Sequence, residues 1–248
     1  MNAVLFTIYD TTAEQFALTK AAFESIQAQD IPVKVYVLNN GSTWSETLVW
    51  IEQIRQNNNV FMFRSESVNK SPIFLANRYL WYLFVENEDW DDYHHVLCVP
   101  NDVVLPPNLY REFLRFPRGI VTGSMTDGSL GIIDRATAVN ECTPLAVCLI
   151  RKWAHDALVA KDGYFFDPKF FMYASDCDFA LRLAACGIRG VQLDIQYWHY
   201  GSASHRLGKH GEGAYGADAD RDYFRSKWGF AVDDPQYGEK ARDINFLG

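Results

Sequence analysis

The chain lacks any long apolar segment. Its first residues form one short apolar run, Ala3–Tyr9, and no basic segment precedes it, so a secretory signal peptide is not expected. No later window contains the ~18 uncharged apolar residues that a membrane-spanning helix needs. We therefore expect no membrane span and a cytoplasmic location.

Cysteine and positive charge are also in short supply. The five cysteines include no Cys-x-x-Cys pair, which argues against a disulfide scaffold or a zinc ribbon and favours free thiols. Against 31 acidic residues there are only 23 Lys and Arg, giving a formal net charge of −8. That balance argues against a non-specific nucleic-acid binder, although the net charge of the whole chain does not exclude a local basic patch.

Several catalytic signatures are missing. The sequence contains no Gly-x-x-x-x-Gly-Lys-Ser/Thr loop, no Gly-x-Gly-x-x-Gly after a strand, and no Gly-x-Ser-x-Gly turn. P-loop nucleotidases, ordinary dinucleotide dehydrogenases and serine hydrolases are therefore disfavoured. His199, His205 and His210 do not have the spacing of a structural zinc site.

The residues that are present describe an α/β protein. The 248 residues are 48% hydrophobic and 15% aromatic, typical of a globular domain with a large core and a pocket or groove. Apolar runs predict four strands separated by helical segments, at Val4–Tyr9, Val33–Leu38, Val60–Phe63 and His95–Val99. This alternation predicts a mainly parallel sheet flanked by helices.

The second half of the chain is less regular. We expect strands at 119–125, 146–150 and 191–197, helices at 175–186 and 218–227, and an aromatic segment at 165–173. The glycine-rich segment His199–Gly216 predicts a mobile loop that could cover a ligand, and the last twenty residues are expected to be peripheral. No repeat or linker divides the chain, so a single domain is expected.

Polar side chains follow three of the predicted strands. They are Asp10, the pair Asn39 and Asn40, and the pair Asn101 and Asp102. In parallel sheets ligands bind beyond the carboxyl ends of the strands. One carboxylate together with substrate phosphates commonly holds Mg²⁺ or Mn²⁺, so Asp102 is a candidate metal ligand. The alternative is an aspartate that caps the turn before Pro106.

A second acidic cluster opens the helix predicted at 175–186. Ser175 and Asp178 fit a variant of the capping box, and Asp178 is spaced to pair with Arg182. Asp176 has neither role, which makes it a candidate general base. The alternative is a solvated first-turn acid that the helix dipole favours.

Several spaced segments together resemble the family 2 glycosyltransferases of the GT-A fold. Asn39–Ser42 is similar to that family's Asp-Asn-Gly-Ser turn, and Leu97–Asp102 to its strand-terminal acidic motif. Further matches are Asn69–Ser71 with Asn77-Arg78, Ile150–Lys152, Gly163–Asp167, Phe170-Phe171, Ser175–Asp178 with Arg182, His199 with Ser204, and Tyr223–Gly229. The matches extend over residues 3–229, which makes their combined order more specific than any one of them.

The resemblance implies a GT-A-like, Rossmann-type single domain over residues 1–248. Residues 1–105 would bind the nucleotide, residues 106–205 would form the acceptor half, and residues 206–248 would form a C-terminal loop and tail helix. The activity implied is inverting, metal-dependent sugar transfer from a nucleoside-diphosphate sugar to a hydroxyl. Asp102 and His199 would hold Mn²⁺ or Mg²⁺, Asp176 would be the catalytic base, and Asp178 and Arg182 would support it. The implied nucleotide-binding residues are Thr7, Tyr9, Asp10, Asn39, Asn40, Asn77, Asn101 and Asp102.

The chain also departs from the family pattern. Asn39 stands where the family has an aspartate that contacts the nucleotide base. Because an amide can both donate and accept hydrogen bonds, the sequence does not identify the nucleotide base. Ser71 and Tyr79 replace glycines, and Ser175 replaces the first acid of the usual Glu-Asp pair. Two alternatives follow: a nucleotidyltransferase on a similar sheet, and a catalytically silent sugar-nucleotide-binding module. A glycan, a lipid-linked saccharide, a protein or a modified nucleic-acid base could each be the acceptor.

Overall fold

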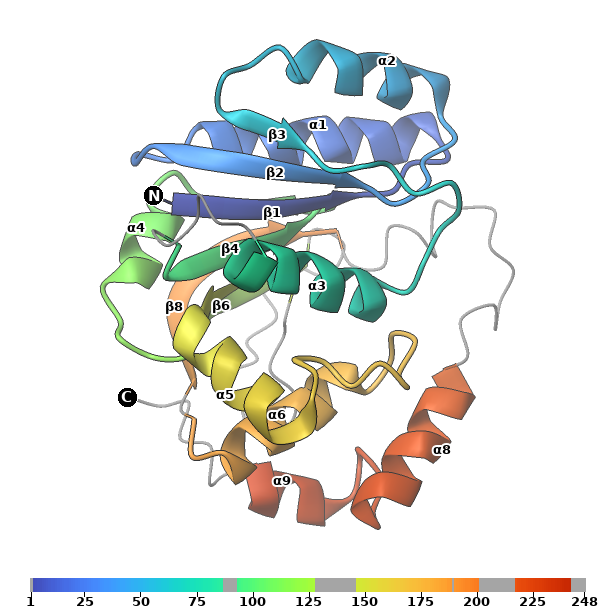
Figure 1. Cartoon of the computed structure of the whole chain (residues 1–248), viewed down its shortest axis with the longest axis vertical. Helices are drawn as coiled ribbons and strands as arrows, with labels where there is room; N and C mark the ends of the chain where they lie inside the picture. The colour runs from blue at the N-terminus through green and yellow to red at the C-terminus, as the bar shows by residue number, and fades with distance from the viewer. Residues whose placement is uncertain (1, 87–92, 128–145, 189, 201–216, 242–248) are drawn as a thin grey trace.

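The four strands of the N-terminal half lie side by side and run parallel. The computed structural model describes residues 2–86, 93–127, 146–188, 190–200 and 217–241, and Figure 1 shows its layers. The strands are β1 (Asn2–Ile8), β2 (Val33–Asn39), β3 (Val60–Met62) and β4 (His95–Pro100), in the order β3-β2-β1-β4. β1 therefore lies at the centre, between β2 and β4.

Four further strands extend the sheet to the order β3-β2-β1-β4-β7-β6-β8-β5. They are β5 (Val103–Val104), β6 (Ile120–Asp127), β7 (Cys148–Arg151) and β8 (Gly190–His199). β7 is antiparallel to both of its neighbours, β6 is parallel to β8, and β5 is antiparallel to β8. The β6–β8 register shifts at Gly123, where an added Cβ would lie 2.5 Å from the Ile195 carbonyl oxygen, so only glycine fits this irregularity.

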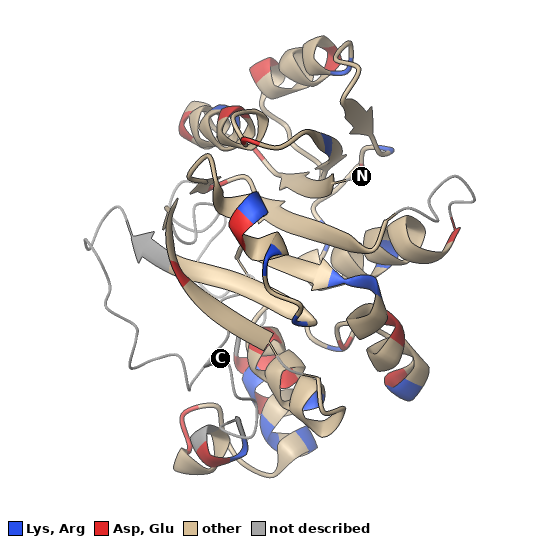
Figure 2. Cartoon of the chain, turned by 90° about the vertical axis from the view of Figure 1, so that its left-hand side faces the viewer, with Lys and Arg blue, Asp and Glu red and all other residues tan. Residues whose placement is uncertain are grey.

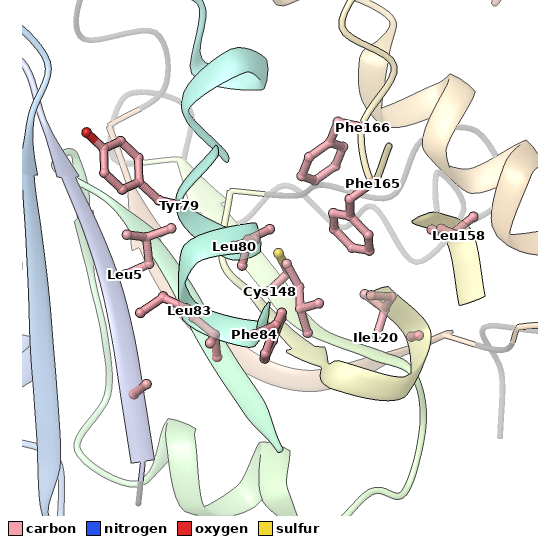
Figure 3. Packing of buried hydrophobic residues seen from close by; sticks show 14 of the residues in the cluster. Leu5, Tyr79, Leu80, Leu83, Phe84, Ile120, Cys148, Leu158, Phe165 and Phe166 are labelled. Atoms are coloured by element: carbon pink, nitrogen blue, oxygen red, sulfur yellow. The ribbon is translucent and has the colours of Figure 1, made fainter. Parts of the chain in front are cut away.

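Helices cover both faces of the sheet because successive β1 side chains point to opposite faces. Val4, Phe6 and Ile8 pack in the apolar cluster that includes residues of α1 (Ala13–Gln27), α2 (Ser45–Ile54) and α4 (Leu109–Leu114). Ala3 and Leu5 pack on the other face. That cluster includes residues of α3 (Pro72–Trp81), its π-helical continuation η1 (Tyr82–Glu86), α5 (Lys152–Asp162) and α6 (Ser175–Ala185). In Figure 3, Leu80, Leu83, Phe165 and Phe166 lie in this second cluster.

A third apolar cluster joins the end of the chain to α6. It contains Phe170, Cys177 and Leu181, together with Phe224, Phe230 and Tyr237. Phe224 comes from α8 (Ala217–Trp228) and Tyr237 from α9 (Pro235–Ala241), drawn in red in Figure 1. The expectation that the last twenty residues are peripheral is wrong for Phe230 and Tyr237, which are 4% and 1% exposed.

The sheet and its flanking helices confirm the predicted α/β fold. Four elements of the structure were not predicted from the sequence, namely β5, α4, α5 and α9. Most of the predicted mobile loop, residues 201–216, lies outside the described residues. Cys98, Cys148 and Cys186 are free thiols, as expected, whereas Cys177 is disulfide-bonded, so that expectation is wrong for this residue.

Two further observations concern possible partners. Within the described ranges, no helix is long and apolar enough to cross a membrane. Lys and Arg positions are interspersed with Asp and Glu positions over the elements in the view of Figure 2.

Candidate active site

The polar residues that follow three strands meet at one edge of the sheet. Ile8 at the end of β1 is paired with Asn39 of β2, and Thr7 is paired with Pro100 of β4. Because β1 lies between the other two strands, the residues after all three strands come together, as the sequence predicted. Asn101 and Asp10 are in direct contact there.

Asp10 holds this edge together. One carboxylate oxygen accepts hydrogen bonds from Thr19 Oγ1 at 2.7 Å and Asn101 Nδ2 at 2.9 Å, and the other accepts from Thr47 Oγ1 at 2.9 Å. The side chain is fully buried, and this burial raises the pKa of Asp10 although the three hydrogen bonds oppose the shift. Both oxygens are engaged by the chain itself, which favours a positioning role for Asp10 over direct contact with a ligand.

The turn after β2 is fastened to a second loop. The Asn39 side chain accepts a hydrogen bond from the Ser42 amide at 2.9 Å, which closes the turn locally. Asn40 donates to Asn69 Oδ1 at 2.7 Å and accepts from the Lys70 amide at 2.9 Å. The side-chain amide of Asn40 is thus used to dock residues 69–70 beside the sheet edge. Asn69 also hydrogen-bonds Tyr9.

Gly41 permits this docking because it has no side chain. Its φ is +81°, and a Cβ at this position would lie 2.6 Å from the carbonyl carbon of Val68. Both the left-handed backbone and the close approach of the second loop therefore require glycine.

We expect Gly41→Ala to destabilise the protein by more than the ~1–2 kcal/mol that a left-handed alanine costs. Gly229→Ala is the matched control, because Gly229 has a φ of +79° and nothing within 4 Å of an added Cβ. Urea denaturation of both variants measures the difference. Equal losses of stability would show that the contact with Val68 contributes nothing.

Asp102 and His199, the two metal ligands that the family resemblance implies, lie side by side. The carboxylate Oδ1 of Asp102 is 3.3 Å from Nε2 of His199. Val103 of β5 is paired with His199 at the end of β8, and the Tyr200 amide donates to the Asp102 carbonyl at 2.9 Å. A two-stranded pairing thus brings together two side chains that are far apart in the sequence.

This pair fits part of a divalent metal site. Two ligands bound at ~2.1 Å on adjacent octahedral positions lie about 3 Å apart, close to the separation of Asp102 and His199. The described parts of the chain contain no group of three or more His, Cys, Asp or Glu that could hold a metal. In metal sites with few protein ligands, substrate phosphates and water complete the coordination.

Asn77 links α3 to the segment that contains Phe166. Its Nδ2 donates to the Phe166 carbonyl and its Oδ1 accepts from the Phe166 amide, both at 2.7 Å. Ser71 adds a second link by donating to the Phe171 carbonyl at 2.5 Å. The amide group of Asn77 is occupied by these bonds, which favours a role in joining the two halves over contact with a nucleotide.

Asp176 lies in the first turn of α6. The helix begins after Ala174, which has a φ of 55°, and the Cys177 amide donates to Asp176 Oδ1 at 2.9 Å. Burial raises the pKa of Asp176, and the hydrogen bond from Cys177 opposes this only in part. A carboxylate with a raised pKa is a stronger base than an ordinary aspartate, as general-base catalysis requires.

The neighbouring Asp178 does not form the predicted capping box. Ser175 instead donates to the Met172 carbonyl at 2.6 Å, and Arg182 Nη1 is 3.8 Å from Asp178. The closer partners of Asp178 are Lys227 Nζ at 2.7 Å and Trp228 Nε1 at 2.9 Å. Tertiary contacts with α8 have replaced the local cap.

Arg182 is directed mainly to the segment before α6. Its Nε donates to Asp162 at 2.7 Å, and its two terminal nitrogens donate to the Phe165 carbonyl at 2.7 Å and the Tyr164 carbonyl at 3.0 Å. The predicted pairing with Asp178 is therefore a minor contact. The supporting role that the resemblance implied stays a prediction.

Asp178→Asn is expected to lower stability by about 1–3 kcal/mol, because it weakens the buried contact with Lys227. Asp222→Asn, at a carboxylate that is 77% exposed on α8, is the control and should have almost no effect. Thermal unfolding of the two variants provides the measurement. A loss for Asp178→Asn no greater than that of the control would contradict this account.

Sequence reasoning missed the polar contacts of α8. Asp220, Tyr223 and Lys227 all bind the segment before α6. The sequence predicted this helix at 218–227, but nothing in its local sequence indicated its partners. Asp167 was likewise quoted only as part of a family motif, but it accepts hydrogen bonds from Tyr223 and Lys227.

A cavity of about 540 Å³ lies between α3 and residues 163–168. Its lining includes Phe74, Trp81 and Tyr164 as well as Asn77. The predicted aromatic pocket is thus present, but Asn77 is the one predicted site residue in its lining.

Comparison with known proteins identifies the fold. No protein-family model and no curated protein matches the sequence. Among solved structures, S. aureus TarS (residues 1–349, with UDP-GlcNAc) is similar over 100% of this chain and 72% of its own, with 15% identity and a TM-score of 0.66. The mannosyltransferase PcManGT from Pyrobaculum calidifontis, with GDP-Man and Mn²⁺, is similar over 99% of this chain and 69% of its own. In that case the identity is 14% and the TM-score 0.61.

A longer TarS structure matches over 82% of this chain and 37% of its own, with a TM-score of 0.60. The sheet order and these likenesses agree with the family resemblance of the sequence motifs. The chain therefore has the GT-A fold of these glycosyltransferases.

Proposed function

We propose that this protein is an inverting, metal-dependent glycosyltransferase that moves a sugar from a nucleoside-diphosphate sugar to an acceptor hydroxyl. The observation that carries the proposal is the Asp102–His199 pair, with Oδ1 and Nε2 3.3 Å apart beside the carboxyl ends of the parallel strands. Two proteins of the same fold bind UDP-GlcNAc or GDP-Man, and one of them also binds Mn²⁺.

On the donor side, Asp102 and His199 are the residues that would hold the metal ion. When bound, Mn²⁺ or Mg²⁺ supplies positive charge that stabilises the departing diphosphate. Asn101 is fixed by its bond to Asp10, and Asn40 fixes the loop at residues 69–70. These contacts pre-form the edge at which the nucleotide would bind. The nucleotide-binding role of residues 1–105 is part of this proposal.

On the acceptor side, Asp176 would accept the proton of the attacking hydroxyl. The acceptor oxygen forms a bond to the anomeric carbon while the bond from that carbon to the diphosphate oxygen breaks, in one in-line displacement. The proton moves to Asp176 and the electron pair leaves with the nucleoside diphosphate. The raised pKa of Asp176 supports this role, because it makes the carboxylate a better proton acceptor.

Residues 106–205 would form the acceptor half, and the acceptor is a glycan, a lipid-linked saccharide, a protein or a modified nucleic-acid base. A cytoplasmic location stays a prediction.

A screen of UDP-, GDP- and CDP-sugars tests the proposed activity. We expect slow release of nucleoside diphosphate from at least one of them when Mn²⁺ is present, because water can replace the acceptor. Binding without any hydrolysis would instead support the silent sugar-nucleotide-binding module. Release of inorganic pyrophosphate from a nucleoside triphosphate and a sugar phosphate would support the nucleotidyltransferase.

A further inference from the structure

Asp220 of α8 binds three consecutive backbone amides of the segment before α6. One carboxylate oxygen accepts from the Phe171 amide at 2.8 Å, and the other accepts from the amides of Met172 at 2.9 Å and Tyr173 at 2.8 Å. Asp220 is only 4% exposed. Charge-assisted hydrogen bonds of this kind are about twice as strong as neutral ones, so this one side chain fixes the path of the segment.

Lys227, two turns further along α8, joins the start of this segment to α6. Its Nζ is 2.7 Å from Asp167 and 2.7 Å from Asp178. Burial lowers the pKa of Lys227, but the hydrogen bonds to the two carboxylates outweigh this and raise it. The ammonium group therefore stays charged and compensates two buried acids. Tyr223 adds a hydrogen bond to Asp167 at 2.9 Å.

The segment that α8 holds leads directly into the first turn of α6, where Asp176 lies. Residues 167–174 have no helix or strand of their own, so backbone hydrogen bonds of regular structure do not determine their path. The last of them, Ala174, adopts a left-handed conformation that starts α6. Asp176 follows two residues later. Any displacement of this segment would therefore move the carboxylate of Asp176.

We propose that Asp220 and Lys227 are positioning residues for the base, and that α8 sets the place of Asp176 through the segment Asp167–Asp178. This inference rests on the proposed function, because it takes Asp176 as the base. Side chains of α8 make these contacts, and their partners are backbone amides and carboxylates of residues 167–178. Loss of either positioning residue should reduce the chemical step and leave nucleotide binding intact.

The test compares Asp220→Asn with Asp218→Asn, a matched change on the same helix at a carboxylate that is 98% exposed. The assay is hydrolysis of UDP-, GDP- and CDP-sugars with Mn²⁺, read as kcat and KM for the sugar nucleotide that the wild-type protein turns over fastest. We expect Asp220→Asn to lower kcat by about 10²-fold, since small misplacements of catalytic groups have effects of this size. KM for the donor should not change. Asp218→Asn should match the wild type in both values.

A second measurement does not depend on activity. Hydrogen exchange should be faster at residues 171–173 in Asp220→Asn than in the wild type, while exchange in the central strand β1 should be unchanged.

Lys227→Arg should retain more of kcat than Lys227→Met, because arginine keeps the charge between Asp167 and Asp178. Circular dichroism establishes that each variant is folded.

The outcomes separate this inference from the proposed function. A folded wild-type protein that cleaves none of the UDP-, GDP- or CDP-sugars contradicts the proposed function and, with it, the role of α8. If the wild type is active, equal kcat for Asp220→Asn and Asp218→Asn overturns the positioning role alone. Equal losses in kcat and in donor affinity would also overturn it, because they would indicate a general structural role.

Discussion

Replacing Asp102 by alanine should abolish the extra stability that Mn²⁺ gives to the complex with a nucleoside diphosphate. A ligand at a hundred times its Kd stabilises a folded protein by about 2.7 kcal/mol. In the wild type this stabilisation should be larger with Mn²⁺ than without it, because Asp102 and His199 would link the ion to the fold. Thermal unfolding with UDP, with and without Mn²⁺, gives the measurement. Sugar transfer or hydrolysis should also fall by at least ~10²-fold, because charge stabilisation by the metal is lost.

Asp194→Ala is the control for this prediction. Asp194 lies exposed on β8, the strand that ends in His199, so the substitution removes an equal charge without touching the pair. We expect it to keep the full metal effect. An Asp102→Ala protein that is folded and shows an unchanged metal effect would refute the assignment of Asp102.

Asp176→Asn should lower turnover by ~10²–10⁴-fold, the usual contribution of a positioned general base. Asparagine keeps the size of the side chain and can still accept the Cys177 hydrogen bond, but it cannot take the proton of the acceptor. The affinity for the nucleoside diphosphate should hardly change, because the donor side is untouched. Steady-state kinetics together with nucleotide titration test both parts.

The pH profile gives an independent check on the same residue. Turnover requires the deprotonated carboxylate, so activity should rise with pH as Asp176 loses its proton. Because burial raises the pKa of Asp176, this rise should lie at higher pH than for an ordinary aspartate. If Asp176→Asn kept near-normal turnover while a folded Asp178→Asn lost it, Asp178 would be the base instead.

The polar edge of the sheet at Asp10, Asn40 and Asn101 could be predicted from the sequence because its determinants are local. Strand-forming runs followed by polar residues indicate where each strand ends, and a parallel sheet brings those ends together. Asp10, Asn40 and Asn101 were found in this way. The same reasoning could not predict the hydrogen-bond partners of these residues. Asp10 accepts hydrogen bonds from Thr19 and Thr47, and Asn40 is hydrogen-bonded to residues 69–70. That choice depends on which loops come together in three dimensions.

The pairing of Asp102 with His199 followed from family resemblance and not from local pattern. The two residues meet because the short strand β5 pairs with the end of β8, and two residues of strand give no periodicity to detect. The capping box predicted for Ser175 and Asp178 failed for a related reason. Lys227 and Trp228, from a helix predicted only as a tail, contact Asp178 more closely than its own neighbours do.

The configuration of the released sugar tests the proposed function most directly. Proton NMR of the wild-type protein with an α-linked sugar nucleotide such as UDP-GlcNAc and Mn²⁺ would follow the anomeric proton as the donor is consumed. An in-line displacement predicts that the β-anomer and the nucleoside diphosphate appear first, and that Asp102→Ala and Asp176→Asn greatly slow both. An α-anomer as the first product would contradict inversion. A failure to cleave any UDP-, GDP- or CDP-sugar would contradict the assignment of a glycosyltransferase.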